Sequence, residues 1–373
     1  MSNIKPRGRP DFILLILTIL LVGFGLIMVF SASSTLAVYK HQEAMFYIYR
    51  QGLFAAIGLF LMLFLMGIPF IRWKKIAPIL LLFTLILLIL VLIIGASING
   101  AKRWIVLGSF NLQPSEWTKL SLILYLAALI SNKGERIRDF KKGLLPILVV
   151  AGIVIVLIML QPDFGTMSII CIITLACMIV GGANLRHIML LGLSALPFLA
   201  YVAMSKSYRI QRLTSFLNPL ADPTNTGYQI LQSLMALGHG GLTGTGLGGS
   251  VQKLQYLPEA HTDFIFAIIG EEFGFVGSFL FIVLFFWLLS RGFLIALKSQ
   301  DLFRLIAGIG IVIMIFIQFA LNVGAVVGIL PVTGVPLPFI SYGGSALLTN
   351  MAAVGLLLSI SRENNRLLAE QKL

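Results

Sequence analysis

The chain has 373 residues, of which 58% are hydrophobic and only 11% are charged, and its mean hydropathy is +1.00. A soluble globular chain carries about 25% charged residues, so this composition excludes a soluble domain. The net charge of +13 would indicate a nucleic-acid partner in a soluble protein. In a membrane protein the excess of Lys and Arg in cytoplasmic loops explains this charge, and we expect no nucleic acid.

Long apolar stretches predict transmembrane helices. Phe12 to Phe30 is a run of nineteen residues without a charge, and Ala77 to Ile94 is a run of eighteen. Runs of this length are sufficient to cross a bilayer. The first run is longer than the apolar region of a signal peptide, so we expect an uncleaved helix. Cys171 and Cys177 match no disulfide or metal-binding pattern.

We expect an all-α, polytopic integral membrane protein with about ten transmembrane helices, in a single domain over residues 1–373. The expected spans lie near residues 12–32, 50–70, 77–97, 117–131, 144–161, 164–182, 187–204, 263–289, 305–327 and 344–361. With the N-terminus in the cytoplasm, 18 of the 27 Lys and Arg residues fall on the cytoplasmic side. The positive-inside rule therefore predicts cytoplasmic termini and a large extracytoplasmic loop between helices 7 and 8, residues 205–262.

A glycine-rich segment lies in that outer loop. Gly244, Gly246 and Gly249 spell G-x-G-x-x-G, and Asp263 follows about twenty residues later, as in a dinucleotide-binding fingerprint. No strand precedes the segment and no βαβ unit surrounds it, so we reject the nucleotide interpretation. A flexible or tightly turning glycine loop is the interpretation we retain.

Charged residues at the outer ends of the spans are candidates for a functional site. Glu116 and Lys119 lie one helical turn apart at the start of the fourth span. They form either a structural ion pair or the lining of a polar cavity in which Lys119 contacts an anion. Lys102 and Arg103 lie just upstream, beside Trp104, a residue type common at bilayer interfaces.

Further polar residues lie at the ends of spans or within them. Arg209 and Arg212 suit an anionic target such as phosphate, with lipid headgroups as the alternative. Asp163 lies in a short turn, where we expect it to cap the sixth helix. Gln318 and Asn322 lie one turn apart in the ninth span, and we expect both to form hydrogen bonds between helices.

Asp263 lies where the outer loop enters the eighth span, shortly after Glu259 and His261. It is either the N-cap of that helix or a general base whose pKa is raised by partial burial. Glu271 and Glu272 lie about two turns deeper, where they stabilise packing or tune the cavity.

Six segments together resemble the SEDS family (shape, elongation, division and sporulation proteins) over nearly the whole chain. The segments are Gly100-Ala101-Lys102-Arg103-Trp104, Gln113-Pro114-Ser115-Glu116 with Lys119, Gln161-Pro162-Asp163 with Gly165-Thr166, Tyr208-Arg209-Ile210 with Arg212, the stretch around Asp263, and Leu337-Pro338-Phe339-Ile340-Ser341-Tyr342-Gly343-Gly344-Ser345. Within the family, residues 246–263 are more similar to FtsW and SpoVE than to RodA.

The resemblance implies a peptidoglycan glycosyltransferase that polymerises lipid II on the outer leaflet of the bacterial plasma membrane, for septal wall synthesis in division or sporulation. It implies Asp263 as the catalytic carboxylate. The substrate-binding candidates are Glu116, Lys119, Lys102, Arg103, Trp104, Arg209, Arg212, Glu259 and His261. The implied partners are lipid II, undecaprenyl-diphosphate-linked glycan, a class B penicillin-binding protein (a transpeptidase) and other division proteins. We expect that transpeptidase to dock on spans eight and nine around Phe279 to Phe286.

The chemistry agrees with these residue types. An attacking sugar hydroxyl must lose a proton, which a carboxylate can accept. A departing lipid diphosphate needs cations, from the chain or from a metal ion. The sequence requires no cofactor and leaves a divalent cation, Mg²⁺ or Mn²⁺, open. The alternative functions are a flippase for lipid-linked precursors and a non-catalytic division scaffold. The sequence holds no pair of glycine-interrupted half-helices of the transporter type.

Overall fold

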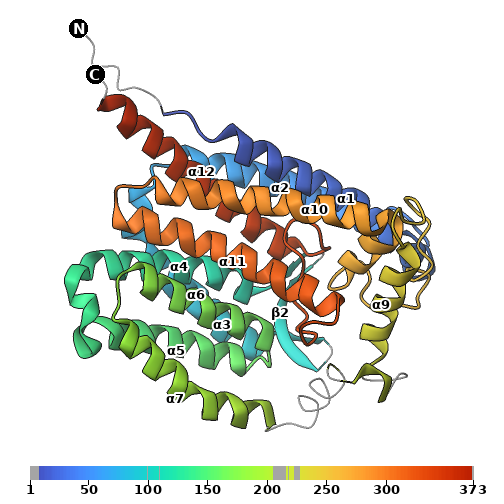
Figure 1. The fold of residues 1–373 in the computed structure, drawn as a ribbon, viewed down its shortest axis with the longest axis horizontal. Coiled ribbons are helices and arrows are strands. Elements are labelled where there is room, and N and C mark those ends of the chain that lie inside the picture. Colours follow the sequence, from blue (N-terminus) through green and yellow to red (C-terminus); the bar gives the residue numbers. More distant parts are fainter. Residues whose placement is uncertain are drawn as a thin grey trace.

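The structure is a computed structural model that describes residues 8–98, 100–108, 110–204, 216, 218–221 and 227–371. Ten long helices in the described residues follow the ten predicted spans in order (Figure 1). They are α1 (Phe12–His41), α2 (Phe46–Gly67), α3 (Ile71–Ile94), α4 (Pro114–Lys133), α5 (Leu145–Met159), α6 (Phe164–Val180), α7 (Leu185–Met204), α10 (Ile265–Leu297), α11 (Leu302–Val326) and α12 (Gly344–Glu370). The predicted polytopic helical fold is therefore confirmed, although α1, α10 and α12 extend well beyond their predicted C-terminal limits.

Seven helical segments of the described chain are long and apolar enough to cross a membrane. They are α1, α2, α3, α10, α11, α12 and residues 140–159, which join the π-helical turn η2 (Phe140–Leu144) to α5. Large apolar side chains such as Phe60, Ile79 and Ile93 are exposed on the outer helices. α12 is instead almost wholly buried, so it forms the centre of the bundle. The chain is a membrane protein whose outer helices face lipid.

Polar caps define several helix starts. Asp11 accepts a hydrogen bond from the Leu14 amide at 2.9 Å and begins α1. Asp163 accepts from both the amide and the hydroxyl of Thr166, which confirms its predicted role as the N-cap of α6. Asp carboxylates are preferred at this position because they satisfy amide groups that lack a helical partner.

The two ends of the bundle differ. Residues near both ends of the described chain meet at one end, where the Asn365 side chain donates to the Arg9 carbonyl at 2.7 Å. At the opposite end lie residues 95–98, 100–108, 110–113, 160–163, 241–264 and 327–343, which we call the loop end (Figure 1). The connections that carry the candidate site residues therefore gather on one side of the bundle.

A small antiparallel sheet, which the sequence analysis missed, lies at the loop end between α3 and α4. Its strands β1 (Ala96–Ile98), β2 (Ala101–Leu107) and β3 (Phe110–Leu112) are paired in that order. Arg103 on β2 donates from Nε to the Gln161 carbonyl at 3.1 Å and from its guanidinium to the Pro162 carbonyl. This arginine therefore attaches the sheet to the turn between α5 and α6.

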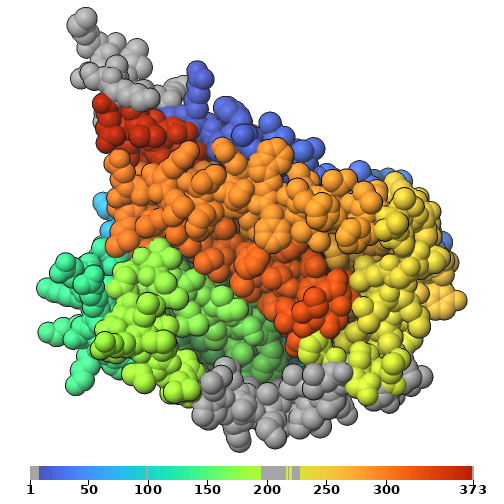
Figure 2. Space-filling model, viewed as in Figure 1, coloured from blue at the N-terminus to red at the C-terminus, as the bar shows by residue number. Residues whose placement is uncertain are grey.

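The connection between α7 and α10 also contains structure that was not predicted. A short 3₁₀ helix, η3 (Pro219–Ala221), and an amphipathic helix, α9 (Tyr228–Gly240), are described within it. The Ser233 hydroxyl on α9 donates to the Val326 carbonyl at the end of α11, at 2.9 Å. Figure 2 shows α9 and the segment after it, in yellow, covering one end of the molecule beside α10. α9 is thus fixed to the helix bundle.

Helix α10 is broken at Gly274, where φ is 67° and ψ is −166°. A side chain at this position is excluded twice, because L residues rarely adopt such a φ and because a Cβ would lie 2.3 Å from the Gly244 nitrogen. The break leaves backbone groups of α10 without helical partners inside the bundle, where such groups are costly to leave unpaired.

The glycine segment supplies those partners. The Thr245 and Gly246 amides donate to the Glu271 and Glu272 carbonyls, both at 3.0 Å, and the Phe275 amide donates to the Gly241 carbonyl at 2.9 Å. Glycine is required at 244 because a Cβ there would lie 2.2 Å from the Glu272 carbonyl oxygen. The loop was predicted to be either flexible or tightly turning, and the second alternative is correct. Its backbone also forms hydrogen bonds with the groups of α10 that the break leaves without helical partners.

Candidate functional site

Asp263 lies half-buried in a tight turn that leads into α10. The turn begins at Glu259, whose φ is 56° and whose carbonyl accepts from the Phe264 amide at 3.2 Å. The exposed Glu259 carboxylate accepts from the Thr262 hydroxyl at 2.7 Å. The N-cap residue of α10 is Phe264, so the alternative role of Asp263 as N-cap is wrong. Asp263 is thus a residue of the turn, one position before the cap.

A second loop, between α11 and α12, forms a wall beside Asp263. Gly334 has a φ of 71°, and a Cβ built on it would lie 3.4 Å from Oδ2 of Asp263. The Asn322 side chain on α11 donates to the Asp263 carbonyl at 2.7 Å and to the Val335 carbonyl at 2.8 Å. The carboxylate therefore lies where the start of α10, the end of α11 and the 331–335 segment meet.

Asn322 and Gln318 were predicted to bond between helices, and they differ in outcome. Gln318 accepts from the Asn350 side chain of α12 at 3.3 Å, as expected. The prediction for Asn322 is wrong, because its side chain donates to two loop carbonyls rather than to another helix. The reason is its position in the last turns of α11, where the nearest acceptors belong to the loop end.

His261 is buried between two tyrosines. Its ring centroid lies 4.9 Å from that of Tyr47 and 5.6 Å from that of Tyr342. Burial lowers the pKa of His261, and Lys40 lowers it further while Glu259 raises it. A neutral imidazole is favoured by these surroundings, so His261 is packed as part of the loop. Its predicted contact with substrate stays a prediction.

The segment from Leu337 to Gly343 holds the Asp263 turn from the other side. The Ser341 hydroxyl donates to the Thr262 carbonyl at 2.5 Å, and the Tyr342 amide donates to the His261 carbonyl at 2.9 Å. Gln51, at the start of α2, donates to the Ser341 carbonyl at 3.1 Å. Sequence reasoning missed Gln51, although a buried amide in an otherwise apolar span was a signal that could have identified it.

Glu116 and Lys119 form a buried ion pair on α4. Lys119 Nζ lies 2.8 Å from Glu116 Oε1, and both side chains are almost completely shielded from solvent. Oε2 of Glu116 has no partner among the described residues, and Lys119 uses only one of its three donor hydrogens there. The ion pair is therefore confirmed, and unused hydrogen-bonding capacity is left on both groups.

The other basic candidates occupy different surroundings. Arg103 is engaged with the turn between α5 and α6, Lys102 is exposed on β2, and Trp104 is half-buried opposite Ala96 of β1. Arg209, together with Arg212, lies outside the described residues. Of this group, Lys102 alone presents an exposed charge within the described chain.

A second buried lysine–glutamate pair joins the loop of residues 241–264 to α10. Lys253 Nζ lies 2.8 Å from Glu272 Oε1, and the Ser31 hydroxyl donates to the same oxygen at 2.6 Å. The neighbouring Glu271 carboxylate accepts from the Val251 amide at 3.0 Å and lies 2.8 Å from His239 Nδ1. The predicted packing role of the two glutamates is confirmed: they hold residues 250–253 against the broken helix.

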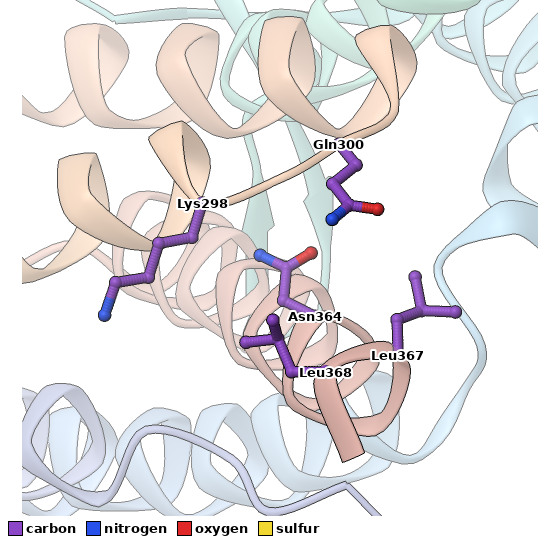
Figure 3. A pocket seen from close by; sticks show the side chains of 5 residues that line it. All are labelled: Lys298, Gln300, Asn364, Leu367 and Leu368. Carbon is purple, nitrogen blue, oxygen red and sulfur yellow. The ribbon is translucent and has the colours of Figure 1, made fainter. Parts of the chain in front are cut away.

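Two other features were considered as sites. A small hollow lined by Lys298, Gln300, Asn364, Leu367 and Leu368 lies at the end of the bundle opposite the loop end (Figure 3). It is remote from Asp263. Within the described part of the chain, no group of three or more His, Cys, Asp or Glu side chains is arranged to hold a metal ion.

Comparison with known proteins gives a consistent assignment. A family model for cell cycle proteins of the FtsW, RodA and SpoVE type matches residues 12–366. The chain is 46% identical to Stage V sporulation protein E of Bacillus subtilis, over 95% of this chain and 98% of that relative. It is 44% identical to a probable peptidoglycan glycosyltransferase FtsW of Trichlorobacter lovleyi, over 94% of this chain and 93% of that relative. The chain belongs to the FtsW/RodA/SpoVE family.

Solved structures of this family share the fold. A chain from the structure described as "Structural coordination of polymerization and crosslinking by a peptidoglycan synthase complex" has a TM-score of 0.79 at 31% identity, covering 95% of this chain and 98% of that one. The Rod shape determining protein RodA of Thermus thermophilus has a TM-score of 0.71 at 29% identity, covering 95% of this chain and 97% of that one. The family resemblance predicted from the six sequence segments is thereby confirmed.

In this FtsW/RodA/SpoVE family member, the structure brings some predicted site residues together. Glu259, His261 and Asp263 share one turn, and Glu116 and Lys119 share one ion pair. α11 packs against both α4 and α10, so one helix supports both groups.

Proposed function

We propose that this chain is a peptidoglycan glycosyltransferase that extends a glycan strand from lipid II, with Asp263 as the general base. The observation that carries the proposal is the placement of the Asp263 carboxylate: half-buried, at the loop end of a membrane bundle, and walled by Gly334. Membership of a family whose relatives include probable peptidoglycan glycosyltransferases supports it.

The reaction needs a proton acceptor at the attacking sugar. The acceptor hydroxyl loses its proton to the Asp263 carboxylate while its oxygen forms a bond to the anomeric carbon of the donor. The bond from that carbon to the diphosphate oxygen breaks, and the lipid diphosphate leaves with the electron pair. A carboxylate is suited to this role because it can accept a hydrogen bond from the attacking hydroxyl and then take up its proton.

The departing diphosphate needs positive charge. Lys119 is suited to this role because a buried ammonium with unused donor hydrogens gains from an incoming anion. Lys102, Arg209 and Arg212 are further candidates for the same anion and for the lipid headgroup that carries it. A requirement for Mg²⁺ or Mn²⁺ stays a prediction, and chelation by EDTA in the polymerisation assay checks it.

The experiment is polymerisation of purified lipid II by the purified protein, with glycan length resolved on a gel. Asp263→Asn should keep the fold and abolish polymer, because an amide cannot accept the proton. The matched control is Asp301→Asn, an N-cap at the other end of the bundle, where asparagine caps as well as aspartate. Absence of polymer with the wild-type protein would favour the flippase or scaffold alternative, and normal polymer with folded Asp263→Asn would refute the assigned base.

We place the loop end outside the cell and both termini in the cytoplasm, with the protein at the division septum. The distribution of Lys and Arg supports this orientation. Leu247, in the glycine segment, is 60% exposed, whereas the nearby Ser250 is buried. A cysteine introduced by Leu247→Cys should react with a membrane-impermeant thiol reagent in intact protoplasts. Reaction only after lysis would reverse the orientation.

We also propose that a class B penicillin-binding protein docks on α10. The family likeness to a chain from a peptidoglycan synthase complex supports a protein partner. Phe279 and Phe286 are exposed on α10, which runs along the surface in Figure 2. Changing both to alanine should reduce co-purification of the partner, while changing the exposed Phe60 and Phe64 of α2 should not. Equal recovery from the two double variants would exclude this docking face.

A further inference from the structure

We propose that Asn322 is a positioning residue for catalysis: its carboxamide fixes the backbone of Asp263 to the loop wall opposite and so sets the place of the carboxylate. This inference rests on the proposed role of Asp263 as base. It assigns a function to a residue of α11 that contacts the backbone of the Asp263 turn and not its carboxylate.

The geometry of Asn322 is that of a bridge between two segments. Its Nδ2 lies 2.7 Å from the Asp263 carbonyl oxygen and 2.8 Å from the Val335 carbonyl oxygen. An amide nitrogen has two hydrogens, and here each has its own acceptor. The residues joined in this way are 72 positions apart in sequence, one before α10 and one after α11. A single side chain therefore links the base to its wall.

Asn322 is buried, so its amide group depends on partners within the protein. The residue is only 2% exposed, and its Oδ1 has no partner among the described residues. A buried amide oxygen without a partner costs free energy. The two hydrogen bonds that Asn322 donates offset that cost. An apolar residue of similar size would remove the unpaired oxygen but would leave two loop carbonyls without a donor.

The wall that Asn322 holds is itself fixed from behind. A Cβ at Gly165, in the first turn of α6, would lie 2.6 Å from Val335 Cγ2 and 3.0 Å from the Thr333 carbonyl oxygen. The 333–335 segment is therefore pressed against α6. Gly334 then faces Asp263 without a side chain, which leaves space beside Oδ2. With α6 behind it and Asn322 in front, the segment cannot shift without moving the Asp263 turn.

The test compares two buried amides one turn apart on α11. Asn322→Leu removes both bonds to the loops, whereas Gln318→Leu removes a buried amide that bonds only to Asn350 of α12. We expect Asn322→Leu to lower kcat about tenfold to hundredfold with KM for lipid II within about twofold, because a misplaced catalytic group slows the chemical step. Gln318→Leu should lower thermal stability to a similar degree and keep kcat within about twofold.

A second variant covers the case in which Asn322→Leu does not fold. Asn322→Asp is nearly isosteric but offers at most one hydrogen to the two carbonyls, so it should show the same loss in kcat with KM unchanged. A folded Asn322 variant with wild-type kcat, or one whose loss matches that of Gln318→Leu, would overturn the inference. Asp263→Asn in the same assay separates the two levels: if it is active, the proposed base is wrong, whereas if it is inactive and Asn322→Leu is normal, only the positioning role fails.

Discussion

Two buried lysine–glutamate pairs in this protein have the same chemistry and different surroundings. Lys119 and Glu116 lie on a single helix, 2.8 Å apart. Lys253 and Glu272 are also 2.8 Å apart, but they join the loop of residues 241–264 to α10, and the Ser31 hydroxyl bonds to both charged groups. The second pair, with Ser31, thus joins three segments of the chain by hydrogen bonds. Within the described residues, the charged groups of the first pair bond only to each other.

This difference supports the proposed binding role for Lys119 and a structural role for Lys253. A buried ion pair gains little net stability unless further hydrogen bonds complete it, and removing one partner leaves a costly isolated charge. The pair at Lys253 has an added hydroxyl and holds the loop that closes the break at Gly274. Lys119 is buried and has donor hydrogens that no described residue uses, which is the arrangement that an incoming anion would complete. Substitutions at the two lysines should therefore affect different measurements.

The largest effect is expected at Lys119. Lys119→Met keeps the approximate volume and removes the charge, so polymerisation of lipid II should fall by the equivalent of about 2–5 kcal/mol in transition-state stabilisation. Glu116 is then left without its ion-pair partner. The measurement is polymer yield per folded protein, with thermal stability recorded alongside. Wild-type activity in this variant would make Lys119 a purely structural cation and move the diphosphate site to Arg209 and Arg212.

Substitution of Lys253 should lower the stability of the protein. Lys253→Met isolates the buried Glu272 carboxylate and should lower the free energy of unfolding by about 3–5 kcal/mol, seen as a lower Tm in detergent. Adding Glu272→Gln removes the stranded charge and should restore a large part of the loss, with polymerisation per folded molecule close to wild type throughout. The corresponding double change at Glu116 and Lys119 should restore no activity. If the variants of the two pairs change Tm and polymerisation per folded molecule to the same degree, the two pairs do not differ in role.

The sequence predicted the helices because their signal is local. Apolar runs and charged ends placed ten spans in the right order, and Asp163 and Gln318 were assigned correctly from their own surroundings. Asp263 became a candidate because a carboxylate at the entry to a span is costly without a role, and the family resemblance then implied that it is the catalytic carboxylate. These inferences needed only residues near one another in the chain.

What the sequence could not show depends on contacts between distant residues. Ser31 and Glu272 are 241 positions apart, and Asn322 and Asp263 are 59 apart. No local pattern specifies such pairs. The break at Gly274 was also missed, because a glycine inside an apolar run gives no sign that another loop will supply its hydrogen bonds. The fold was thus largely predictable from the sequence, and the hydrogen bonds between distant residues around the candidate site were not.

The smallest effect is expected at Ser31, and it tests why the second pair is stable. Ser31→Ala removes a hydroxyl that donates to Glu272 and accepts from Lys253, but it leaves the ion pair in place. We expect a loss of about 1 kcal/mol in the free energy of unfolding, since single side-chain hydrogen bonds in membrane proteins contribute on this order. Ser33 provides the control: it lies two residues further along α1, is equally buried, and its hydroxyl has no partner among the described residues. Ser33→Ala should therefore leave the Tm unchanged or raise it slightly. If the two alanine variants unfold at the same temperature, Ser31 adds nothing to the pair, and the salt bridge between Lys253 and Glu272 is stable without the hydroxyl.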